Sequence, residues 1–452
     1  MTTIRRRPAE RRARTVLRAV VATGRAAGAA CLFASATAAL AQSDGATAGQ
    51  PGFQFNGFGT VAAVGVDSPD DWGFRRELTQ PARRDSGLRF DTDTRLGLQA
   101  DWRASAQWEF VGQLVLKPRP PEETNQESVT EAFVAWRPSA DWTLRLGRTS
   151  PDLFLLADSR NVGFSYPWIR PNVEFYGWVP IRQLDGMDVT RQWSLGDARW
   201  RAKLFGGRST VTFADSEDFA DRARINQFVG GTLAMDSGAW TLKATVARAK
   251  TRPFDEAGLQ QARAALDQIA MLPVPAVAQQ AAVLRDSFPA GTLVTHYSAL
   301  SAAWDAAPWQ LQAEVSRIDG NFATSRAWYG YASAARRFGE ATTVFAMAGV
   351  ARSSHAAVPE PDWTAALTPI VGPQLAAGAQ LAGASVAQST NGALEDEHSV
   401  SLGMRYDLGP QLALKAQVDA VRTARHGGGL WAFSTSAAHH ALVGSVGVDF
   451  VF

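Results

Sequence analysis

The chain has 452 residues, one cysteine and a formal net charge of +2. The excess of positive charge belongs to the first 41 residues, whose removal would take out eight arginines and one glutamate and leave a net charge of −5. This balance does not favour nucleic-acid binding. Cys31 also lies in that segment, so we expect neither disulfides nor thiol chemistry in the remainder.

The amino-terminal segment has the features of a secretory signal peptide. Its first 25 residues are rich in arginine, residues 26–38 are mostly small and apolar, and Ala39-Leu40-Ala41 fits an A-x-A cleavage site. We expect residues 1–41 to be removed, so that the mature chain begins at Gln42.

Short polar turns recur along the mature sequence, and most of them are flanked by tryptophan. They lie near residues 102–108, 136–142, 193–200, 235–240, 304–309, 338–340 and 407–410. Nine of the fifteen tryptophans fall at these turns. Indole has an apolar body and a polar N–H group, so such a gathering indicates an aromatic girdle at one membrane interface. The alternative is ordinary hairpins with tryptophan in a soluble core.

Long connections alternate with the short turns. They lie near residues 65–85, 118–126, 149–184, 208–225, 251–291, 318–325, 352–396 and 423–439. Seven turns and eight long connections predict sixteen strands, with the first strand, residues 53–64, pairing with the last. An even number of strands, with short turns at one end and long loops at the other, is typical of bacterial membrane barrels.

Within the predicted strands, apolar and polar residues alternate. Val400, Leu402, Met404 and Tyr406 share one face, opposite Ser401, Arg405 and Asp407. No apolar run in the mature chain reaches the roughly 18 residues of a spanning helix. A membrane protein of this composition must therefore be a closed antiparallel β-barrel with its polar face toward a wet lumen. A soluble secreted β protein is the alternative.

Two segments depart from the strand pattern. Residues 256–288 have helical spacing, interrupted by Pro273 and Pro275, and residues 363–388 are rich in alanine and glycine. Both lie in predicted outer loops. We therefore expect one barrel domain, residues 42–452, with its longest loops at 149–184, 251–291 and 352–396.

Two stretches resemble Gram-negative outer-membrane porins. The chain ends in an alternating strand whose last residue is Phe452, which is similar to the closing strand read by the barrel-assembly machinery in that family. The stretch Leu144-Arg145-Leu146-Gly147-Arg148 resembles the strand that leads into the third loop of general porins. The resemblance implies that this loop folds into the barrel and narrows the channel. The usual short acidic signature of the constriction is absent.

Charged residues on the third loop and on the inward faces of nearby strands are therefore candidates for a constriction. Opposite charges across such a narrowing would orient permeating solutes and select ions. The loop candidates are Asp152, Asp158 and Glu174, and the wall candidates are Arg95, Arg145, Arg199, Arg201 and Lys203. The alternative is an outer loop with solvated ion pairs.

The sequence thus predicts an outer-membrane porin for passive diffusion of small hydrophilic solutes and ions. The resemblance implies a homotrimer. One alternative is a channel specific for a sugar or an anion, bound through Trp168, Tyr176 and Trp178. Another is a barrel adhesin or enzyme. No catalytic or metal-binding spacing is recognisable, so we expect no enzyme activity, cofactor or metal.

Overall fold

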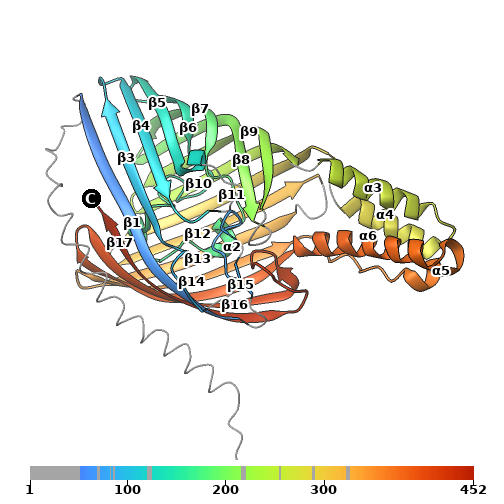
Figure 1. The fold of residues 1–452 in the computed structure, drawn as a ribbon. Coiled ribbons are helices and arrows are strands. Elements are labelled where there is room, and N and C mark those ends of the chain that lie inside the picture. Colours follow the sequence, from blue (N-terminus) through green and yellow to red (C-terminus); the bar gives the residue numbers. More distant parts are fainter. Residues whose placement is uncertain are drawn as a thin grey trace, which may run out of the picture.

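The computed structural model describes residues 51–68, 72–81, 83–84, 87–119, 125–214, 220–253, 256–287, 291–321 and 326–452. These residues form one large antiparallel sheet that closes on itself (Figure 1). The expected signal peptide, residues 1–41, lies outside the described residues.

Sixteen long strands make the barrel, as predicted. They are β1 (Gly52–Asp67), β3 (Arg95–Arg103), β4 (Trp108–Leu116), β5 (Val129–Ser139), β6 (Trp142–Thr149), β7 (Leu184–Leu195), β8 (Ala198–Ala214), β9 (Ala220–Ser237), β10 (Trp240–Pro253), β11 (Leu293–Ala306), β12 (Trp309–Gly320), β13 (Ala327–Phe338), β14 (Thr342–Ser353), β15 (Glu395–Gly409), β16 (Leu412–Gly428) and β17 (His439–Val451). An additional two-residue strand, β2 (Leu88–Arg89), pairs with β1.

The barrel closes where β1 meets β17. Their register runs from Phe58 opposite Val451 to Asp67 opposite Leu442, and the other edge of β1 pairs with β3. Closure gives each of the sixteen long strands a hydrogen-bonded neighbour on both sides, which a sheet in a lipid bilayer requires. The expected pairing of the first and last strands is therefore confirmed.

Side chains alternate between a lipid-facing surface and the lumen. On β11, Leu300 points outward and is 64% exposed, whereas the next residue, Ser301, points inward and is 6% exposed. On the outer surface of β8–β14 there is a shallow apolar hollow of about 880 Å³. The hollow exists because Ala302, Ala313 and Ala332 lie side by side on the adjacent strands β11, β12 and β13. Their small side chains fill little of the outer surface there.

All seven predicted short turns join consecutive strands at one end of the barrel. Tryptophans from adjacent strands pack beside one another there. Trp108 stacks on Trp136, with ring centroids 6.0 Å apart, and Trp193 stacks on Trp200 at 6.3 Å. This arrangement is a girdle on the outer surface, where both the apolar ring and the polar N–H find a suitable environment.

Two loops are shorter in the structure than the sequence predicted. Strands β8 and β9 continue through most of residues 208–225, and β16 continues to Gly428 within the predicted loop 423–439. The apolar residues of β8 change sides near its outer end, where Val211 points into the lumen and packs with Ile225 and Phe228. The pattern of apolar residues on the lipid-facing side of β8 therefore ends before the strand itself ends.

Four helices form a small bundle beyond the rim of the barrel (Figure 1). They are α3 (Glu256–Ala270) and α4 (Pro275–Ser287) from one loop, and α5 (Thr364–Val371) and α6 (Pro373–Gly392) from another. The bundle has its own apolar core, which includes Leu266, Leu284, Trp363 and Leu367. The segment with helical spacing, residues 256–288, thus forms two helices, and the alanine- and glycine-rich segment, residues 363–388, is helical as well. Among the described residues, no helix has the length and apolar character needed to cross a membrane.

Candidate functional site

The third long loop, residues 150–183 between β6 and β7, lies inside the barrel. It contains the short helices η3 (Gly163–Ser165) and α2 (Val173–Tyr176), and α2 is visible within the barrel in Figure 1. The loop reaches strands far from its own. The indole Nε1 of Trp168 donates to the Ser333 hydroxyl at 3.0 Å, and the backbone N–H of Ile169 donates to Gln417 at 3.0 Å. The inward folding implied by the resemblance is therefore observed.

Arg170 is a fully buried charged residue of this loop, with 1% of its surface exposed. Its guanidinium donates to Asp93 at 2.7 Å and to Asp419 on β16 at 2.8 Å, and also to the Ser445 hydroxyl on β17. Burial would raise the pKa of Asp93, but the nearby Arg170 and Arg76 outweigh that effect and lower it. Arg170 thus ties the third loop to the barrel wall and to the first loop.

Lys415 on β16 supports the loop backbone. Its ammonium donates to the carbonyl oxygens of Gly163, Tyr166 and Trp168 at 2.6–2.7 Å and forms an ion pair with Asp449 at 2.7 Å. The loop approaches the wall so closely here that a Cβ on Gly163 would lie 2.1 Å from the Asp449 carboxylate. Glycine is therefore required at this contact.

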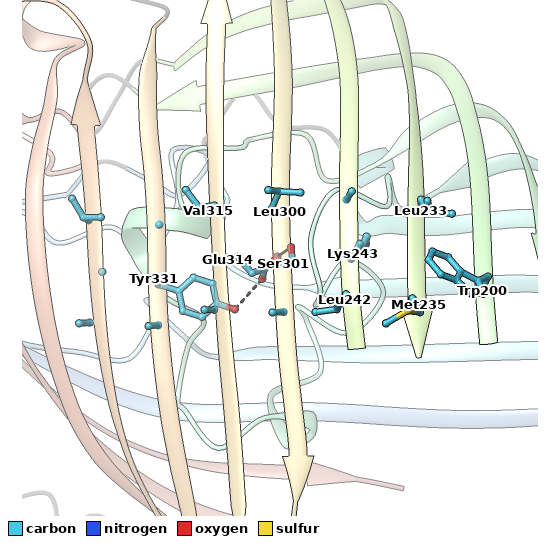
Figure 2. Close-up of a pocket in the computed structure, with 18 residues that line it drawn as sticks. Trp200, Leu233, Met235, Leu242, Lys243, Leu300, Ser301, Glu314, Val315 and Tyr331 are labelled. Atoms are coloured by element: carbon cyan, nitrogen blue, oxygen red, sulfur yellow. Dashed lines mark hydrogen bonds between the residues drawn. The ribbon is translucent and has the colours of Figure 1, made fainter. Parts of the chain in front are cut away.

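Glu314 on β12 is a third anchor and receives four hydrogen bonds. Ser301 and Tyr331, on the neighbouring strands, donate to it at 2.7 and 2.9 Å (Figure 2). From the loop, the backbone N–H of Leu155 donates at 3.0 Å, and the Tyr176 hydroxyl also donates. A buried carboxylate with four donors is well satisfied, so this contact fixes both ends of the inner part of the loop.

Asp152 attaches the start of the loop to strands β8–β10. It forms ion pairs with Lys203 at 3.6 Å and with Lys243, and accepts a hydrogen bond from Thr232 at 3.2 Å. Burial alone would raise the pKa of Asp152, but the two ammonium groups outweigh it and lower the pKa to about 2. The structure thus joins two predicted site residues, Asp152 and Lys203, in an anchor.

Glu174 is buried against the wall rather than exposed in the lumen. Its carboxylate accepts from the Asn172 amide at 2.6 Å, while Asn172 also caps α2 by accepting from the Phe175 N–H at 3.0 Å. Burial raises the pKa of Glu174. Both side chains lie over Gly349 on β14, where a Cβ would come within 2.2 Å of Asn172 and 2.4 Å of Glu174.

The other predicted site residues divide into two groups. Arg95 is buried and donates to the carbonyl of Asn161 at 2.6 Å and to Tyr166 at 2.9 Å, so it supports the loop. By contrast, Asp158, Arg199 and Arg201 are exposed. Among the described residues, none of these three forms an ion pair.

Asp158 faces the wall that the loop leaves uncovered. It lies within electrostatic range of Glu131 on β5 and of Arg145 on β6. Arg145 is paired with Asp188 on β7 at 2.7 Å. The loop anchors lie mainly on β8–β17, so the open part of the lumen is bordered by Asp158 and by strands β5–β8. A role for these charges as a constriction stays a prediction.

Cationic side chains gather around one carboxylate of the first loop. Glu77 in the first loop forms ion pairs with Lys117 and, at 3.2 Å, with Arg160, and lies 3.8 Å from Arg182. Although burial would raise its pKa, these cations and Arg76 lower it well below the ordinary value. One carboxylate is therefore surrounded by four cationic side chains.

The residues that hold the loop were mostly missed at the sequence level. Arg170, Glu314 and Lys415 were not among the predicted site residues, although Glu314 and Lys415 occupy inward positions. The alternation of strand residues identifies such positions but not their partners. Within the described ranges, no group of three or more histidine, cysteine, aspartate or glutamate side chains could hold a metal ion.

Comparison with solved structures supports the same architecture. The anion-selective porin from Comamonas acidovorans superimposes with a TM-score of 0.52 at 14% identity, covering 89% of this chain and all of that one. OmpF from Salmonella typhi, in a complex with daunomycin, gives 0.50 at 13% identity, covering 88% and 97%. The chain has the porin fold. No family model and no curated protein sequence matches this chain.

Proposed function

We propose that this porin-fold protein is a non-enzymatic diffusion channel of the Gram-negative outer membrane. The observation that carries this proposal is the third loop, which is fixed to one side of the lumen and leaves charged, solvent-exposed side chains on the other. Small hydrophilic solutes and ions would pass between Asp158 and strands β5–β8. A rigid loop would set the size limit, and the charges would bias which ions enter.

An anion-preferring channel is the second candidate. Arg199 and Arg201 are exposed in the lumen, and among the described residues neither is neutralised by an ion pair. Cationic side chains also gather around Glu77 in the first loop. Asp158 and Glu131 oppose this bias, so the preference depends on which charges lie nearest the narrowest point.

The biogenesis and assembly of the channel follow from the same proposal. Export would use the signal peptide at residues 1–41, and insertion would use the barrel-assembly machinery and surrounding lipid. A homotrimer is proposed from the porin resemblance. The single domain would begin at residue 42 and carry its longest loops at 149–184, 251–291 and 352–396.

Single-channel recording in a planar lipid bilayer tests the proposal. The purified protein should give stable conductance steps, and closure in threes under voltage would support a trimer. Under a salt gradient, the sign of the reversal potential distinguishes anion from cation preference. A correctly folded barrel that gives no steps would refute the open-channel proposal and favour an adhesin or enzyme.

A further inference from the structure

A polar cleft lies outside the channel, where the base of the helical bundle meets the loop between β16 and β17. Its volume is about 420 Å³, within the range of small-molecule sites. Helix α6 contributes Gln388 and Asn391, and the segment before α5 contributes Glu360. The loop between β16 and β17 contributes Ser434 and its neighbours Thr435 and Ser436, while His426, Ala384 and three glycines complete the lining.

The chemistry of this cleft differs from that of the other hollows. The hollow on β8–β14 is lined mainly by alanine, leucine and valine. The lining of the polar cleft contains no phenylalanine, tyrosine or tryptophan and no large aliphatic side chain, but it contains amide, hydroxyl, imidazole and carboxylate groups. It has no lysine or arginine. An apolar ligand would therefore find few complementary groups, and an anion would lie near Glu360 with no lysine or arginine in the lining to pair with it.

Several of these polar groups are available to a ligand. Among the described residues, the side chains of Glu360, Gln388, His426 and Ser434 make no hydrogen bond within the protein. In contrast, the Asn391 side chain is held by the protein itself, because its amide accepts from the Val358 N–H at 2.8 Å and donates to the Val358 carbonyl at 2.9 Å. Asn391 thus holds the wall in place while its neighbours remain free.

The backbone of the cleft is strained. Among the described residues, the non-glycine residues with positive φ are His426, at 61°, and Phe433, at 59°. His426 lines the cleft, and Phe433 directly precedes Ser434. Such conformations are uncommon for non-glycine residues and cluster at binding sites, where the surrounding structure maintains them. The His426 N–H donates to the Ser436 carbonyl at 3.1 Å, which holds the two sides of the loop together.

We propose that this cleft binds an uncharged, hydroxylated ligand of one or two sugar units. Neutral donors and acceptors that converge on a small volume suit adjacent hydroxyl groups, each of which both donates and accepts. Gly392 lies at the edge, where a Cβ would meet no atom within 4 Å, so the backbone is accessible. The sugar could be a free solute or part of a surface polysaccharide. This proposal does not depend on the channel function.

Calorimetric titration of the full-length protein in detergent tests the proposal. Maltose serves as the free-sugar probe and a delipidated O-polysaccharide as the surface probe, with glucuronate as an anionic comparison. The variant Q388A/S434A removes two free polar groups and should weaken binding about tenfold, because the ligand would lose a hydrogen bond to each of them. The control is Q374A, which truncates an exposed glutamine of the same helix that does not line the cleft.

The two probes separate the possible sources. Maltose binding that Q388A/S434A weakens and Q374A preserves supports a free-sugar site, and the same result with the polysaccharide alone supports a surface-polysaccharide site. Absence of binding by both probes would overturn the proposal. Binding that Q388A/S434A leaves unchanged would also overturn it, because the sugar would then occupy another place, such as the lumen. Circular dichroism of each variant checks that the barrel is intact.

Discussion

Replacing Arg170 by alanine should release the third loop from the barrel wall. The substitution removes the buried guanidinium that joins Asp93 and Asp419. Breaking a buried ion pair by removing one partner costs about 3–5 kcal/mol. Asp93 would keep its contact with Arg76 at 3.3 Å, and Asp419 would keep its hydrogen bond from Gln417 at 2.7 Å. We therefore expect a loss at the lower end of this range.

The expected consequence is local, because Arg170 joins the loop to side chains of the wall and takes no part in the backbone hydrogen bonds between strands. A loss of about 3 kcal/mol corresponds to roughly a hundredfold faster exchange of loop amides that open locally. Hydrogen–deuterium exchange measured by mass spectrometry should show this over residues 150–183, with the strands unchanged. In bilayers, the single-channel current should become noisier.

A matched control removes the same chemical group without touching the loop anchors. Arg199 is exposed in the lumen and, in the part of the chain that the structure describes, forms no ion pair. Arg199→Ala should therefore leave loop exchange unaltered, although it can change ion preference. If Arg170→Ala gave the same exchange rates as Arg199→Ala, the reasoning that Arg170 holds the loop would be refuted.

Three further perturbations have defined outcomes. Asp152 has a pKa lowered from 3.8 to about 2, so its stabilisation of about 2 kcal/mol is complete above pH 4 and is lost as the pH falls through 2. The protection factors of the loop amides, which are exchange rates corrected for the intrinsic rate at each pH, should therefore be lower in Asp152→Asn at pH 7 than in the wild type at pH 7 and should resemble those of the wild type near pH 2. Equal protection of both proteins at pH 7 would contradict this. Gly349→Val should lift α2 from β14 and speed exchange at Phe175, whereas Ala348→Val, which adds volume on the lipid side, should not. Arg201→Glu should move the reversal potential toward cation preference, and an unchanged potential would place Arg201 away from the ion path.

The strands could be predicted because a barrel wall imposes a strict two-residue period. Contact with lipid favours apolar residues such as Leu300 on one face of each strand, and the membrane–water interface favours tryptophan at the short turns. The prediction of strand ends failed where apolar side chains fill the lumen. Near the outer ends of β8 and β9, inward residues such as Val211 and Phe228 pack together with apolar loop residues, so polarity no longer reports which side a residue faces.

The candidate site was only partly predictable for a related reason. The sequence indicated that Asp152 and Glu174 lie on an inward-folding loop, but it could not show which wall residues they meet. Lys243 and Asp152 are 91 positions apart, and Arg170 and Ser445 are 275 apart. Such partners are determined by how the loop lies across the lumen. Only Asp158 among the loop candidates remains exposed.

The seam between β1 and β17 has a consequence for how the protein folds. Thr60 donates to Asp449 across that seam, although the two residues are 389 positions apart. Contacts between such distant positions carry a large loop-closure cost and slow folding. Until the seam forms, the edges of β1 and β17 remain open to pairing with other chains. The protein therefore needs protection during the interval between export and closure, and aggregation should compete with folding mainly at this step.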